Sequence, residues 1–109
     1  MRVRSKRMSQ HATYWPPVGR ERDGSVEFGP PEQICVRWQD KAELFRDSDG
    51  REVTSSAVVF VGREVEVRGA IAQGKHDDES PYDASAREIR QLGVSPNLGG
   101  TEKIVKAWL

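Results

Sequence analysis

The sequence predicts a mainly β protein: a small antiparallel β-barrel with one short α-helix and a long projecting hairpin loop. Apolar residues alternate with polar ones through 32–38 and 64–68, and an apolar, β-branched run fills 57–61. Alternation at period two buries one face of a strand and exposes the other. Asp49-Gly50 is a strong turn signal in a polar stretch between these segments. The alternation assigns five residues to the core: Ile34, Val36, Trp38, Val65 and Val67.

Short strand patterns recur along the rest of the chain, bounded by glycine and proline. The first strand should end, or lie at a sheet edge, at Pro16-Pro17, because proline has no N–H to donate to a ladder. In chain order, we expect strands at 11–18, 25–28, 32–38, 57–61, 64–71 and 101–109.

The segment from Asp83 to Gly93 is the stretch that predicts a helix. Asp83 or Ser85 can cap its free N–H groups, and Ala86, Ile89 and Leu92 share one face of the helix. Gly93 stands where a glycine commonly ends a helix. A helix this short needs to dock on the rest of the protein to be stable.

The chain has 109 residues, and we expect a single domain at 11–109 preceded by a basic extension at 1–10. Basic and acidic residues number 17 each, so the formal net charge is zero, which argues against a dedicated nucleic-acid binder. The extension carries Arg2, Arg4, Lys6 and Arg7, and it is either a solvated terminus or a nucleic-acid arm.

The start of the chain lacks the pattern of a secretory signal, because Ser9-Gln10-His11 follows the basic residues in place of an apolar run. No window approaches the roughly 20 apolar residues that a membrane helix requires. We therefore expect a soluble, intracellular protein without a membrane partner.

Side chains that could support catalysis or bind metal are present without a convincing arrangement. Cys35 and Ser55-Ser56 have no recognisable neighbouring base. The run from His76 to Glu79 is sequential, without the spacing that brings metal ligands onto one face. Asp47, Asp49 and Glu52 form an incomplete calcium-loop pattern. We expect no enzymatic activity, no catalytic residue, no metal and no cofactor.

Aromatic residues leave two alternatives open. Tyr14, Trp15, Trp38 and Trp108 could form a stacking platform on a small barrel that binds single-stranded nucleic acid. Trp15 and Trp38 also fit core positions by alternation, and we favour the core assignment.

Taken in order over about residues 13–109, the sequence resembles the head-closure proteins of long-tailed bacteriophages, also called stoppers or head–tail connector proteins. The motifs that carry the resemblance are Tyr14-Trp15 before a Gly-Ser turn, Ile34-Cys35-Val36-Arg37-Trp38, the Asp49-Gly50 hairpin leading to 55–61, Ala86-Arg87-Glu88-Ile89-Arg90-Gln91, Pro96-Asn97-Leu98, Thr101-Glu102, and Lys106-Ala107-Trp108-Leu109. The basic extension at 1–10 lies outside this pattern.

The resemblance implies a structural virion protein of the neck, made in the cytoplasm of a bacterial host. Such proteins form a homo-oligomeric ring, commonly dodecameric, with a portal or adaptor protein on one side and a tail terminator or tail tube protein on the other. Packaged DNA lies in the channel without sequence-specific binding. A loop from each subunit closes that channel, and by position the loop here comprises Arg46, Asp47, Ser48, Asp49, Gly50, Arg51 and Glu52.

The segment after Gly99-Gly100 is crowded with apolar residues and is expected to dock. An unpaired strand of this composition would promote aggregation. It should meet either the protein's own barrel or a neighbouring ring, through Leu98, Ile104, Trp108 and Leu109.

Overall fold

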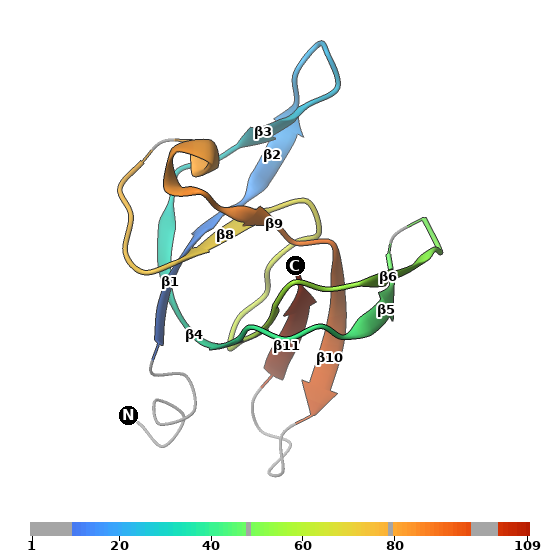
Figure 1. Cartoon of the computed structure of the whole chain (residues 1–109). Helices are drawn as coiled ribbons and strands as arrows, with labels where there is room; N and C mark the ends of the chain where they lie inside the picture. The colour runs from blue at the N-terminus through green and yellow to red at the C-terminus, as the bar shows by residue number, and fades with distance from the viewer. Residues whose placement is uncertain (1–9, 48, 79, 97–102) are drawn as a thin grey trace.

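The computed structural model, which describes residues 10–47, 49–78, 80–96 and 103–109, contains a strongly curled antiparallel sheet (Figure 1). Its seven strands follow the order β10-β11-β7-β4-β1-β8-β9, and two separate hairpins, β2–β3 and β5–β6, extend from it. The predicted mainly β fold is therefore confirmed. The elements are β1 (Gln10–Trp15), β2 (Pro17–Arg20), β3 (Val26–Phe28), β4 (Glu32–Gln39), β5 (Leu44–Arg46), β6 (Glu52–Thr54), β7 (Val58–Val61), β8 (Ala70–Gln73), the 3₁₀ turn η1 (Pro81–Ala84), β9 (Arg87–Glu88), β10 (Gln91–Pro96) and β11 (Lys103–Trp108).

The two edge strands of the sheet, β9 and β10, are consecutive in the chain and are separated only by Ile89 and Arg90. The Ile89 N–H donates to the Gly69 carbonyl at 2.8 Å, while the Arg90 N–H donates to the Trp108 carbonyl at 2.8 Å. Within two residues the backbone thus passes from β8 to β11. The sheet has to curl until its two edges lie together, which produces a half-barrel.

The concave face of the sheet holds the main core. In β4, Ile34, Val36 and Trp38 are buried while Cys35 and Arg37 are exposed, as the alternation predicted. The core also takes Tyr14 from β1, Val59 and Val61 from β7, Ile71 from β8 and Val105 from β11. Trp15 is buried in a second, smaller cluster with Ala70 and Ala72.

The predicted helix from Asp83 to Gly93 is wrong. A four-residue 3₁₀ turn ends at Ser85, whose φ of 55° is left-handed, and the chain then enters β9 and β10. The sheet offers backbone partners on both sides of Ile89, and these hydrogen bonds outweigh a local helical preference that is weak in so short a segment. No helix among the described residues is long and apolar enough to cross a membrane.

The strand predicted at 64–71 is also wrong over most of its length, because β8 begins only at Ala70. Arg68 has a φ of 79°, which a strand cannot accommodate, and the Gly69 N–H donates to the Glu66 carbonyl to close a turn. Val65 is buried as predicted, whereas Val67 is only half-buried. The predicted strand at 11–18 divides at Pro16 into β1 and β2.

The junction between the sheet edges gives a stability prediction. Ile89→Ala should lower the free energy of unfolding by about 2–5 kcal/mol, because it removes fully buried methyl groups. Leu44→Ala removes an aliphatic side chain that is 65% exposed and should cost less than about 0.5 kcal/mol. Urea unfolding of both variants provides the measurement, and equal small losses would show that the closure does not rely on Ile89.

Candidate functional site

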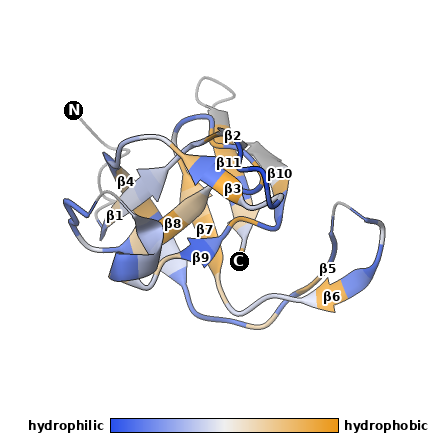
Figure 2. Cartoon of the chain, turned by 90° about the horizontal axis from the view of Figure 1, so that it is seen from above, coloured by the Kyte–Doolittle hydropathy of each residue, from blue (hydrophilic) through white to orange (hydrophobic). Residues whose placement is uncertain are grey.

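The β5–β6 hairpin stands away from the body of the protein (Figure 2). Its pairing places cross-strand partners on common faces: Phe45 opposes Val53, and Leu44 opposes Thr54. Phe45 is buried and Val53 is half-buried, so this inner face points toward the barrel. The outer face is exposed and carries Leu44, Arg46, Glu52 and Thr54.

The tip of the hairpin is ordered by the carboxylate of Asp47. Its Oδ1 accepts hydrogen bonds from the backbone N–H groups of Asp49 and Arg51, both at 3.0 Å. Gly50 supplies a φ of 83° and donates its N–H to the Asp47 carbonyl at 3.0 Å. Arg46 donates from Nη1 to the Gly50 carbonyl at 2.8 Å. The described part of the loop is therefore a preformed turn that carries mixed charge.

The base of the hairpin is fixed to β11 through an aromatic stack. The ring of Phe45 lies over the indole of Trp108 with centroids 5.4 Å apart and planes 8° from parallel. Gly93 leaves room for the indole, because a Cβ at that position would lie 3.0 Å from Trp108 Cη2. The Trp108 Nε1–H donates to Glu43 Oε1 at 2.9 Å, just before β5.

Two residues beside the junction of the sheet edges hold the hairpin strands. Arg90 donates from Nη2 to the Thr54 carbonyl at 3.1 Å, and its guanidinium lies 5.0 Å from the centroid of the Phe45 ring. Gln91 donates from Nε2 to the Arg46 carbonyl at 3.1 Å. Both strands of the hairpin are thus attached to the body at their base, while the tip extends beyond these contacts.

Glu43 is the charged centre of this base. Lys106 Nζ lies 2.5 Å from its Oε1, and Lys41 Nζ lies 3.2 Å from its Oε2. Hydrogen bonds from Lys106 and then Trp108 lower the pKa of the Glu43 carboxyl to about 2. The carboxylate therefore stays ionised well into the acid range.

The structure brings the described residues of the predicted channel loop together at this tip, from Arg46 to Glu52; Ser48 lies outside the described residues. Leu98 of the predicted docking segment also lies outside them. β11 pairs with β10 on one side and β7 on the other, so Ile104 and Trp108 belong to the protein's own sheet, and Leu109 is buried in its core. Of the two expected positions for this segment, the structure shows the protein's own barrel.

Sequence reasoning missed the anchoring residues Glu43, Phe45, Arg90 and Gln91. Phe45 and Trp108 are far apart in the chain, and no local sequence pattern predicts that they stack.

Among the described residues, no group of three or more His, Cys, Asp or Glu side chains is arranged to hold a metal ion. Comparison with family models and with curated protein sequences finds no match to this chain.

The turn chemistry predicts a local effect of Asp47→Ala. Loss of the carboxylate leaves two N–H groups without their acceptor, so amide exchange at Asp49 and Arg51 should accelerate about tenfold. Global stability should change by less than about 0.5 kcal/mol. Asp47→Asn keeps an oxygen acceptor and serves as the matched control. Unchanged exchange in the alanine variant would show that Asp47 does not order the tip.

The lowered pKa of Glu43 predicts an acid-dependent contribution to stability. An unfolded glutamate titrates near its ordinary pKa of 4.5, so the stabilisation is fully present above that pH and is lost as the pH falls toward about 2. The wild type should be more stable than Glu43→Gln at pH 7, and the two should converge between pH 4.5 and about 2. Thermal unfolding followed by tryptophan fluorescence makes the comparison, and a gap that does not vary with pH would contradict it.

Proposed function

We propose that this protein is a structural ring subunit of the phage head–tail interface, which closes the DNA channel after packaging and offers a docking surface for the tail. A portal or adaptor protein on one side and a tail terminator or tail tube protein on the other are the partners that this role requires. The observation that carries the proposal is the β5–β6 hairpin, which is polar, ordered at its tip and anchored at its base.

This hairpin is better suited to the role of a gate than to the role of a simple connector between two strands. Its inner face is held against β11, so the tip has a defined direction relative to the barrel. Preordering lowers the conformational entropy lost when several copies meet in one channel. The molecule, hairpins included, is elongated, with principal extents of 44 × 33 × 23 Å, so its projecting elements can contact separate neighbours.

The charge of the hairpin also suits a passage for DNA. Arg46 and Arg51 are accompanied by Asp47, Asp49 and Glu52, and Arg51 pairs with Asp49 at 3.6 Å. Each phosphate that a protein neutralises adds affinity through counterion release, and uniformly basic loops would hold the genome. Mixed charge allows the hairpins to obstruct DNA without binding it tightly.

Single-stranded nucleic-acid binding was the alternative, and the positions of the tryptophans weigh against its stacking platform. Trp15 is fully buried and Trp38 is 8% exposed. One face of Trp108 is occupied by Phe45. A base would have to displace core contacts to stack on any of these three rings.

The gate is tested by shortening the hairpin. Replacing residues 47–51 by Asn-Gly allows a tight two-residue turn and should change the free energy of unfolding by less than about 1 kcal/mol. Particles assembled with this variant should lose their DNA before tails join, measured as the fraction of filled heads by electron microscopy. The control exchanges Asp49 and Arg51 (D49R with R51D), which keeps the length and the ion pair and should retain DNA. Shortened particles that keep their genome and join tails normally would refute the gating role.

A further inference from the structure

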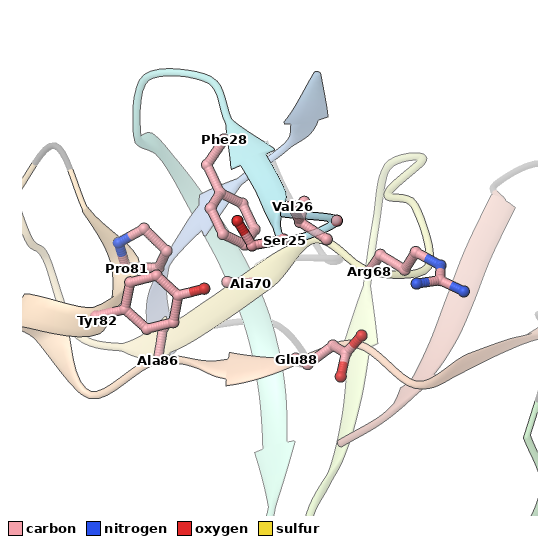
Figure 3. A pocket seen from close by; sticks show the side chains of 10 residues that line it. Ser25, Val26, Phe28, Arg68, Ala70, Pro81, Tyr82, Ala86 and Glu88 are labelled. Carbon is pink, nitrogen blue, oxygen red and sulfur yellow. The ribbon is translucent and has the colours of Figure 1, made fainter. Parts of the chain in front are cut away.

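A groove of about 270 Å³ lies between the β2–β3 hairpin, the 3₁₀ turn and β9 (Figure 3). Its apolar part is formed by Phe28 and Tyr82, whose rings meet edge to face with centroids 6.1 Å apart. Tyr82 is nevertheless 73% exposed, so most of its surface is open to solvent at the groove. The groove is lined by Gly24, Ser25, Val26, Phe28, Arg68, Ala70, Pro81, Tyr82, Ala86 and Glu88.

One end of the groove carries two opposite charges, Arg68 and Glu88, which also line a neighbouring pocket with Asp47 and Asp49 of the chain's own hairpin tip. The side chains of Arg68 and Glu88 are exposed, and neither makes an ion pair or hydrogen bond with another described residue. A ligand surface that complements this groove therefore needs an apolar group beside one cation and one anion.

The outer face of the β5–β6 hairpin has this composition. Leu44 is 65% exposed, and Arg46 stands opposite Glu52 on the same face. The inner face already rests on the protein's own barrel through Phe45, so the outer face points away from that barrel. It is available to a different molecule.

We propose that the outer hairpin face of one copy docks in the groove of a second copy, with Leu44 against Phe28 and Tyr82 and with Arg46 and Glu52 facing Glu88 and Arg68. This inference rests on the proposed ring function and specifies its subunit contact. The contact joins two different surfaces, and a heterologous contact of this kind generates a closed ring when the rotation closes. The tip residues between Arg46 and Glu52 stay free to face the channel.

A single contact of this kind is small compared with the roughly 1,200–2,000 Å² buried in a stable interface. It should be weak between two free copies and gain strength when several copies close a ring or are held on a partner. The test must therefore capture a transient complex.

Disulfide trapping provides such a test. Thr54 shares the outer hairpin face with Leu44, and Ala86 lines the groove, so T54C and A86C leave the proposed anchors intact. Both are placed in a C35S background, because native Cys35 is exposed. Oxidation of an equal mixture at high protein concentration should give the mixed dimer in about tenfold excess over either like-with-like dimer.

Two sets of variants test which residues form the contact. Adding L44D to the T54C chain should reduce mixed dimer about tenfold, because a carboxylate would enter an apolar groove. Adding V18D should leave it unchanged, since Val18 is similarly exposed but does not line the groove. R46E in the T54C chain should lower the yield, and E88R in the A86C chain should restore it by returning opposite charges.

Mixed dimer no more abundant than the like-with-like dimers, or equal sensitivity to V18D and L44D, would overturn the contact. If it fails while the wild-type chain still forms larger species in sedimentation experiments, the ring uses another surface and the proposed function stands. If it fails and the wild-type chain also stays monomeric, the contact is wrong, and particle electron microscopy tests the ring function separately.

Discussion

The backbone from Arg87 to Pro96 forms both edge strands of one sheet, and the rest of the fold depends on this constraint. β9 pairs with β8, β10 pairs with β11, and only Ile89 and Arg90 separate them. Because a strand pair has a fixed spacing of about 4.8 Å, the two edges of the sheet must come together around this segment. The core then fills the concave side, and the fully buried Ile89 packs into it.

The same segment connects closure of the sheet to the candidate site. Arg90 follows Ile89 and donates to the Thr54 carbonyl, while Gln91 donates to that of Arg46. The hairpin is therefore attached where the sheet closes. Trp108, whose carbonyl receives the Arg90 N–H, also stacks on Phe45. Because the same residues close the sheet and hold the hairpin, correct closure of the sheet also fixes the direction of the hairpin. Folding and the proposed gating role therefore depend on the same contacts.

Sequence patterns predicted the parts of the fold that local chemistry decides. The alternation around Val36 identified β4 and its buried face, and Asp49-Gly50 located the hairpin turn. The helix prediction failed because the apolar spacing of Ala86, Ile89 and Leu92 also suits a chain that leaves one strand and joins another. Helical propensity is a weak preference, and pairing to both sheet edges overrides it. No pattern in the sequence predicts that the two edges of the sheet lie next to each other.

The candidate site likewise has one part that the sequence predicts and one part that it does not. Its tip was predictable, since Asp, Gly and the surrounding charges define a polar turn. Its anchors were not, because Phe45 and Trp108 meet only after the barrel forms. The alternation in β11 separated the buried Val105 and Ala107 from Ile104 and Trp108, yet the sequence left open whether this strand joins its own barrel or a neighbour.

A cryo-electron microscopy reconstruction of the assembled neck tests the proposed role most directly. Density for each subunit should place the β5–β6 hairpin toward the central axis, with Asp49 and Arg51 at the narrowest point of the channel. The curled sheets should form the wall of the ring around it. A ring in which the hairpins point outward, or a neck that lacks this subunit, would contradict the account.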